Sequence, residues 1–200
     1  MWWTRACVAL IVSFAAMVSA AEDITIRAVA SGATLRAGFA VGGSRVLPEI
    51  VYIKGDMTRL EFQDGGETDY ILRDGKAHAS WLVNEKARVV MPLGNGPSAR
   101  QYLFNVDRPC AEFSGSCTKG ERATVAGRAA TRWRFLDAGH SGPDGADNGT
   151  MWIDDESGLL LGYDGKDMSG RPMKWTVTSV ETGEISPDLF KMPAVEPRKP

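Results

Sequence analysis

Apolar and polar residues alternate with a period of two along the last third of the chain. The run Met173–Glu181 places Met, Trp and Val at alternate positions, with Lys and two Thr between them. Two further apolar runs, Gly149–Asp154 and Leu159–Asp164, precede it, and the turn-forming clusters Asp155–Gly158 and Gly165–Gly170 separate the three. Alternation of this kind is typical of a half-buried strand, and Asp/Ser/Gly clusters favour chain reversal. The stretch therefore predicts an antiparallel meander.

The same alternation of strand-like runs and turn clusters covers most of the chain. The other runs with strand character are Ile24–Val29, Thr34–Val41, Arg45–Lys54, Met57–Phe62, Asp69–Arg73, His78–Val83, Ala87–Pro92, Arg122–Val125 and Arg128–Leu136. Turn signals that recur every eight to twelve residues or so favour an antiparallel barrel or sandwich. The fold class predicted is mainly β, with roughly ten or eleven strands.

Little of the sequence favours a helix. Ser98 can cap a short helix that runs to about Val106, and no other segment has comparable helical periodicity. A sheet of this many strands must curl, and its concave face needs a cover that keeps apolar side chains from water. Either the sheet closes on itself, or the concave face is a ligand groove. Near the C-terminus, Leu189-Phe190 is expected to pin the tail against the sheet.

Residues 1–21 have the plan of a secretory signal peptide. Arg5 precedes the apolar run Ala6–Val18, and small residues follow, so cleavage after Ala20 or Ala21 is expected. A permanent N-terminal anchor is the alternative, but a membrane-spanning helix needs about 20 apolar residues. The prediction is an exported, periplasmic protein.

The remaining chain is expected to form one domain. No later segment is apolar enough to span a membrane, so we expect a single β domain at residues 22–193 and a flexible tail at residues 194–200. The formal net charge of the full sequence is −2, which gives no indication of nucleic acid or an anionic membrane as a partner. A monomer without a membrane span is expected.

Two cysteines lie beyond the signal segment. Cys110 and Cys117 enclose a short run of mostly small residues. In an oxidising compartment an even pair favours a disulfide, which would stabilise the fold by about 2.5 kcal/mol in the chain-entropy model. A metal or redox pair is the alternative, but it would need further ligands or a closer spacing.

Motifs for catalysis and cofactors are mostly missing. His78 and His140 have no motif partner, and Gly139–Pro143 fails the nucleophile-elbow pattern at its last position. Asp144–Gly149 resembles a calcium loop but lacks the distal Glu, so turn chemistry explains it better. Asp154–Glu156 could form a paired-carboxylate site, although a solvated hairpin end is the more common origin of such a cluster. We expect no cofactor, no metal and no enzymatic activity.

Several of these runs together resemble a known family. The segments Tyr52–Phe62, Gly127–Phe135, Gly149–Gly165 and Met173–Pro193 are similar to those of outer-membrane lipoprotein-sorting (LolA-like) proteins of the bacterial periplasm. The resemblance implies an unclosed half barrel with one or two short helices, whose concave apolar face holds acyl chains under a helical lid. Gly55-Asp56 stands where the dedicated carrier has Arg-Pro, so the chain is closer to relatives of the carrier than to the carrier itself.

Tryptophans on the strands could stack on a sugar, line a lipid cavity or fill a core. The leading hypothesis is a non-enzymatic protein that binds an acyl chain, lipid or lipoprotein on the concave face. The residues expected to line that face are Leu60, Phe62, Leu72, Trp81, Trp133, Phe135, Met151 and Trp175. Leu60→Glu or Phe135→Glu should then weaken ligand uptake without unfolding the protein.

The alternative function is a protein-interaction or envelope-stress sensor module. Such a module would fill the concave face with its own side chains and use an exposed loop, for which Asp137–Asn148 is the candidate. Its partner would be another envelope protein. Alternation along the strands is the same for a groove and a filled core, so it does not separate the two functions.

Overall fold

The structure, a computed structural model, describes residues 22–193 apart from residues 33, 37–38, 42–45, 65–66, 95 and 97. The predicted signal peptide, its cleavage site and the predicted tail lie outside these residues and stay predictions. In the part that is described, no helix is both long and apolar enough to cross a membrane.

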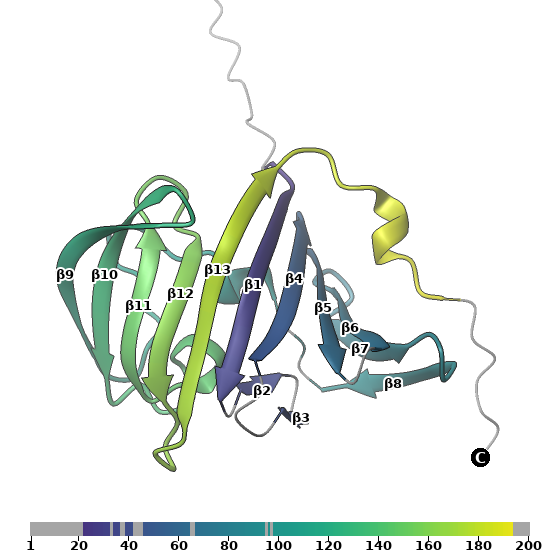
Figure 1. Cartoon of the computed structure of the whole chain (residues 1–200), viewed down its shortest axis with the longest axis horizontal. Helices are drawn as coiled ribbons and strands as arrows, with labels where there is room; N and C mark the ends of the chain where they lie inside the picture. Colours follow the sequence, from purple (N-terminus) through teal and green to yellow (C-terminus); the bar gives the residue numbers. More distant parts are fainter. Residues whose placement is uncertain are drawn as a thin grey trace, which may run out of the picture.

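Eleven strands form one antiparallel sheet, in the order β8-β7-β6-β5-β4-β1-β13-β12-β11-β10-β9 (Figure 1). A small separate sheet pairs β2 with β3. The bounds are β1 Ile24–Gly32, β2 Thr34–Arg36, β3 Phe39–Val41, β4 Val46–Lys54, β5 Met57–Asp64, β6 Glu67–Asp74, β7 Ala79–Asn84, β8 Val89–Leu93, β9 Ser116–Val125, β10 Arg128–Leu136, β11 Asn148–Asp154, β12 Leu160–Lys166 and β13 Pro172–Thr182. β8 and β9 are the two edges of the sheet and do not meet. The predicted fold class, mainly β with an unclosed antiparallel sheet, is confirmed.

The sheet consists of two meanders that meet at β1. β4 to β8 follow one another along the chain and in the sheet, and so do β9 to β13. β1 pairs antiparallel with β4 on one side and with β13 on the other. The first and last strands of the domain therefore lie together at its centre.

The core lies along the inner face of the sheet. Residues that are directly opposite one another on six successive strands, β10 to β13, β1 and β4, form one buried row. The row consists of Trp133, Met151, Tyr163, Trp175, Ala30 and Leu47. Cross-strand neighbours of this kind pack side by side and set the register of a sheet.

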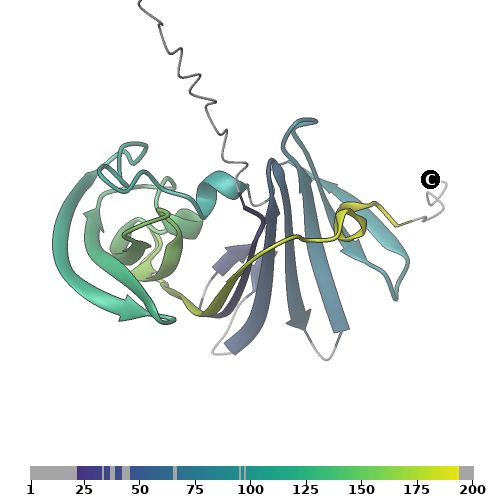
Figure 2. The same cartoon turned by 90° about the horizontal axis from the view of Figure 1, so that it is seen from above.

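Irregularities in the ladder bend the sheet. The register shifts between Arg27 and Ala28 in the pairing of β1 with β13, and again in the β9–β10 and β11–β12 pairings. Bulges increase local twist and bend a strand. Figure 2 shows β9 to β12 curling around the loops between them, while β4 to β8 form a flatter half.

The helix expected from Ser98 to about Val106 is wrong in its extent. Only a 3-10 turn, η1 (Ala99–Gln101), forms, and the Ser98 backbone N–H donates to Gln101 Oε1 at 2.8 Å. Leu103 then forms a bridge with Leu159, and the Phe104 N–H donates to the Gly158 carbonyl at 2.8 Å. Pairing with the β11–β12 turn supplies hydrogen bonds that helix elongation would otherwise provide, so tertiary contacts override the local preference.

The other two 3-10 turns are η2 (Pro143–Gly145) and η3 (Pro187–Phe190).

The prediction that the C-terminal segment packs on the sheet is confirmed. Ile185 and Phe190 are buried against the outer-face residues Tyr70 and Leu72, and Leu189 packs beside them. Arg59 Nη1 donates to the Leu189 carbonyl at 2.9 Å while its guanidinium lies 3.6 Å from the centre of the Tyr70 ring. The segment thereby covers part of the outer face of β5 to β8, as Figure 2 shows.

Candidate functional site

The eight residues expected on one concave face do not share a face. Leu60, Phe62, Trp133, Phe135, Met151 and Trp175 belong to the inner core or pack against it. Leu72 and Trp81 are opposite one another on β6 and β7 and belong to the outer cluster under η3. The separation arises because β6 is apolar on both faces: Tyr70 and Leu72 point outward and Ile71 points inward.

The inner face of the β10–β13 half is filled by the protein's own side chains. The Trp175 side chain is 1% exposed, and its indole lies 5.8 Å from the Tyr102 ring and 6.5 Å from the Tyr163 ring, centre to centre. Trp175 Nε1 donates to Glu49 Oε2 at 3.0 Å, and Glu49 is 2% exposed. An aromatic residue with its polar atom satisfied inside the core is held by packing. A ligand contact for the six inner residues stays a prediction.

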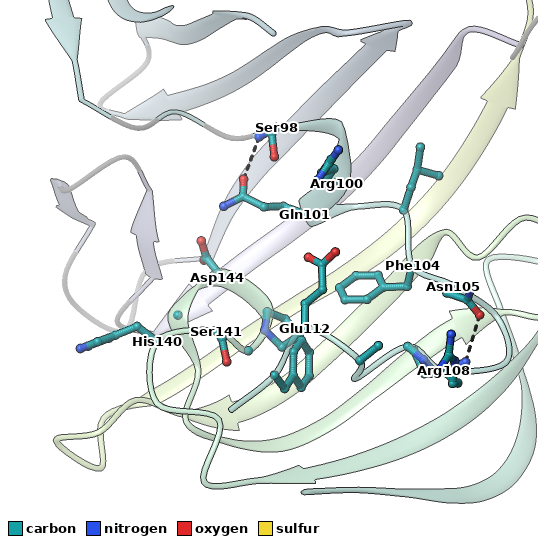
Figure 3. A pocket seen from close by; sticks show the side chains of 17 residues that line it. Ser98, Arg100, Gln101, Phe104, Asn105, Arg108, Glu112, His140, Ser141 and Asp144 are labelled. Carbon is teal, nitrogen blue, oxygen red and sulfur yellow. Dashed lines mark hydrogen bonds between the residues drawn. The ribbon is translucent and has the colours of Figure 1, made fainter. Parts of the chain in front are cut away.

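A pocket of about 450 Å³ lies above this filled face, and we call it the loop pocket. Three segments line it: residues 98–105 around η1, residues 108–113 beside the disulfide, and residues 140–145 around η2 (Figure 3). The third segment is part of Asp137–Asn148, the surface expected for an interaction module. The other two carry no strand periodicity, so the alternation pattern gave no signal for them.

Aromatic rings form the floor of the loop pocket. Phe104 and Phe113 meet edge to face, with ring centres 6.2 Å apart and planes at 89°. Phe113 meets Phe135 of the core in the same way, at 5.7 Å and 72°. Leu103, which is 36% exposed, adds apolar surface at the side. The floor is therefore continuous with the core below it.

Side chains of Arg, Glu and His form the rim. Arg100, Arg108, Glu112 and His140 are exposed, and none of them forms an ion pair with another described residue. Figure 3 shows Glu112 projecting into the pocket beside Phe104, whereas His140 points away from the centre. Asp144 is different, because its Oδ2 accepts a hydrogen bond from the Tyr163 hydroxyl at 2.8 Å. Arg100, Arg108 and Glu112 are thus charged groups without an ion pair among the described residues, and the aromatic rings lie at the base of the pocket.

The predicted disulfide between Cys110 and Cys117 is confirmed. It joins the 108–113 segment to the start of β9, with the two Cα atoms 5.9 Å apart. Cys117 is opposite Phe135 on β10, so the cross-link attaches the pocket wall directly to the sheet. The disulfide thereby limits how far Glu112 and Phe113 can move.

The acidic cluster Asp154–Glu156 forms a hairpin end. Asp154 Oδ1 accepts hydrogen bonds from the backbone N–H groups of Glu156 at 3.1 Å and Ser157 at 2.7 Å, and Arg128 Nε donates to Oδ2 at 2.7 Å. Burial alone would raise the pKa of Asp154, but the hydrogen bonds from Arg128 and Ser157 outweigh it and lower the pKa. The carboxylate organises the turn.

The loop that contains Asp144–Gly149, which resembles a calcium loop in sequence, is closed by its own hydrogen bonds. Asp147 Oδ1 accepts from the Gly139 N–H at 2.8 Å, and the Ala138 N–H donates to the Asp147 carbonyl at 2.8 Å. Within the described ranges, no group of three or more His, Cys, Asp or Glu side chains is placed to hold a metal ion. His78 lies in the turn between β6 and β7.

Comparison with known proteins shows similarity of structure only. No protein-family model matches the chain, and no curated protein sequence matches it. The complex of MucA and MucB from Pseudomonas aeruginosa matches with a TM-score of 0.54 and 15% identity over 88% of this chain and 57% of the matched chain. MucB in complex with periplasmic MucA matches with a TM-score of 0.52 and 15% identity, over 86% of this chain and 55% of that one. The chain therefore spans a little over half the length of these MucB structures.

An uncharacterised conserved protein from Thermus thermophilus matches over 86% of both chains, with a TM-score of 0.53 and 11% identity. A putative outer membrane lipoprotein-sorting domain from Vibrio parahaemolyticus matches over 84% of this chain and 88% of its own, with a TM-score of 0.39 and 9% identity. The unclosed antiparallel sheet with short 3-10 turns has the LolA-like half-barrel architecture expected from the sequence.

Proposed function

We propose that this protein is a non-enzymatic binding protein of the cell envelope that holds a segment of a partner protein in the loop pocket. The observation that carries the proposal is the anatomy of that pocket over a filled core. Its base consists of the aromatic rings of Phe104 and Phe113, and its rim carries Arg100, Arg108 and Glu112. Protein interfaces have an apolar centre and a polar rim, and they are enriched in aromatic residues and Arg.

The fold relatives support the same class of function. One of the matched structures is MucB in a complex with another protein, MucA. This chain carries its candidate surface on the inner side of the sheet, where three loops meet. Loops on a rigid scaffold are the common location of binding residues. The 140–145 segment and the disulfide-bound 108–113 segment are such loops.

An acyl chain or other lipid is the second candidate ligand. The supporting observation is the row of rings Phe104, Phe113 and Phe135, which leads from the pocket into the core. Burial of a lipid tail contributes about 0.8 kcal/mol per methylene. Lipid sites, however, enclose most of the ligand in apolar surface. The inner face of β10 to β13 is occupied by Tyr163, Trp175 and their neighbours, so a tail would have to displace loops to go deeper.

Site-specific photo-crosslinking in the cell envelope tests the proposal. A photo-crosslinking amino acid replaces Leu103 in the pocket and, as the control, Leu136 on the outer face of β10; the two residues are 36% and 39% exposed. We expect one discrete protein adduct at position 103 and none at position 136. Mass spectrometry identifies the adduct, and the purified partner must then form it again with the purified protein.

Phe113→Glu should abolish that adduct, whereas Leu136→Glu should not. Native mass spectrometry of the purified wild type separates the two ligand classes. A copurified lipid that Phe113→Glu removes, without a protein adduct, would favour the second candidate. If neither a protein adduct nor a lipid is found, the loop pocket is not the binding site and the proposal is refuted.

A further inference from the structure

A second, smaller pocket lies at the open edge of the sheet. Its volume is about 160 Å³, and its walls come from β9, β10 and β11 together with Val106, Asp107 and Asp155. We call it the edge pocket. It shares no lining residue with the loop pocket, and the segment around Val106 separates the two.

A bulge in β9 determines the chemistry of the edge pocket. Lys119 is opposite Trp133 and Arg122 is opposite Thr131, so two residues of β9 face the single residue Arg132 of β10. Residues three apart on a regular strand point to opposite faces. Because of the bulge, Lys119 and Arg122 both lie on the inner face, on the side of Trp133. Bulges that redirect side chains are common beside functional sites.

The Asp155 carboxylate in the edge pocket is held in place before any ligand binds. Asp155 Oδ1 accepts from the Thr131 hydroxyl at 2.6 Å, and its Oδ2 lies 3.2 Å from Arg122 Nε. The Lys119 ammonium lies 5.7 Å from the centre of the Trp133 ring, and the Trp133 side chain is 9% exposed at the pocket wall. The pocket thus offers a held carboxylate, Asp155, and two exposed donors, Lys119 and Arg122, beside one indole.

Opposite charges balance in this pocket. Asp154 is paired with Arg128, and Asp155 is paired with Arg122. Lys119 and Asp107 remain, with opposite signs, and neither forms an ion pair with another described residue. A charged ligand would leave one of these groups uncompensated, whereas a neutral ligand with several hydroxyl groups can use both.

We infer that the edge pocket binds one neutral sugar ring. The exposed part of the Trp133 indole can contact C–H groups of a pyranose, and adjacent hydroxyl groups donate to carboxylates and accept from Lys and Arg. Asp155 and Arg122 present such an acceptor and donor side by side. The sugar is either a free monosaccharide or the terminal unit of a longer glycan. This second site is independent of the partner segment proposed for the loop pocket.

Titration of the purified mature protein with sugars tests the inference. The probes are glucose, mannose, N-acetylglucosamine and the linear trimer of N-acetylglucosamine, and the readout is the indole N–H signal of Trp133 in a proton–nitrogen NMR spectrum. We expect at least one probe to shift this signal, and not that of Trp175, with a dissociation constant on the order of 1 mM. Tighter binding of the trimer than of its monomer identifies a glycan end; equal binding identifies a free sugar.

Matched variants on one strand and its neighbour complete the test. Lys119→Ala and Thr131→Val should each raise the dissociation constant of the sugar about tenfold, because each removes one hydrogen-bonding group from the pocket. Arg134→Ala, which changes an exposed residue on the outer face of β10, should leave the dissociation constant unchanged. The inference is overturned if no probe shifts the Trp133 signal, or if the variants and the control bind alike. Thr131→Val keeps the test decisive if Lys119→Ala alters the bulge.

Discussion

Replacement of Phe135 by glutamate distinguishes a filled core from an open groove. If Phe135 lined a groove, a carboxylate there would weaken the uptake of an apolar ligand and leave the fold intact. In the structure, however, Phe135 is 0% exposed, and its ring meets that of Phe113 at 5.7 Å. The substitution therefore places an unpaired carboxylate inside the core, and we expect it to unfold the protein.

The expected loss of stability is large. Removal of a buried aromatic side chain costs about 3–5 kcal/mol, and a buried charge without a partner costs about 3–5 kcal/mol more. A typical domain has a free energy of unfolding of only about 5–15 kcal/mol. For a domain of this size each kcal/mol lowers the melting temperature by about 2–4 °C. We expect Phe135→Glu to melt more than about 10 °C below the wild type or not to fold.

Thermal unfolding followed by near-ultraviolet circular dichroism measures the effect. Leu136→Glu is the control, because it introduces the same charge on the adjacent residue, which is 39% exposed on the outer face. Its stability should change by no more than about 0.5 kcal/mol. A Phe135→Glu protein that melts like the wild type but no longer binds a fluorescent fatty acid would contradict the filled core and support an open ligand groove.

Three further changes have defined outcomes. Replacement of both Cys110 and Cys117 by Ser should lower the free energy of unfolding by about 2.5 kcal/mol in a denaturant titration, and a reductant should lower that of the wild type equally. Because folding lowers the pKa of Asp154 below its ordinary 3.8, its contribution to stability is complete above that pH and is lost as the pH falls further. The urea midpoint should thus fall more steeply in acid for the wild type than for Asp154→Asn. Phe190→Ala should lower the free energy of unfolding by about 3 kcal/mol and accelerate hydrogen exchange in β6 and β7. If the C-terminal segment only rested on the surface, the substitution would change neither quantity.

The strands were predictable because the period of two is a local property. The last three predicted runs correspond to β11, β12 and β13, and each boundary lies within two residues of the predicted one. The turn clusters between them fix where the chain reverses, since Asp, Ser and Gly bond to the local backbone or take positive φ angles. Gly158, with a φ of +74°, is one such position.

The face of each strand was not predictable wherever both sides are apolar. In β6 the consecutive residues Tyr70, Ile71 and Leu72 are all buried. Alternation then gives no preference, and which residue points inward depends on what covers the other side. Here Ile185 and Phe190, from the C-terminal segment that contains η3, cover it, more than a hundred positions later in the chain. Long-range contacts of this kind leave no local signal.

Both candidate sites lie where periodicity stops. The loop pocket needs three loops to meet, and the helix predicted after Ser98 ends early because Leu103 pairs with Leu159. The edge pocket needs one extra residue in β9, without which Lys119 and Arg122 would point to opposite faces. Changes in loops and bulges can thus alter what such a sheet binds while its core row of directly opposed residues stays the same. A shared fold at 15% identity is consistent with this separation, and it is why the function here must be tested at the pockets and not inferred from the sheet.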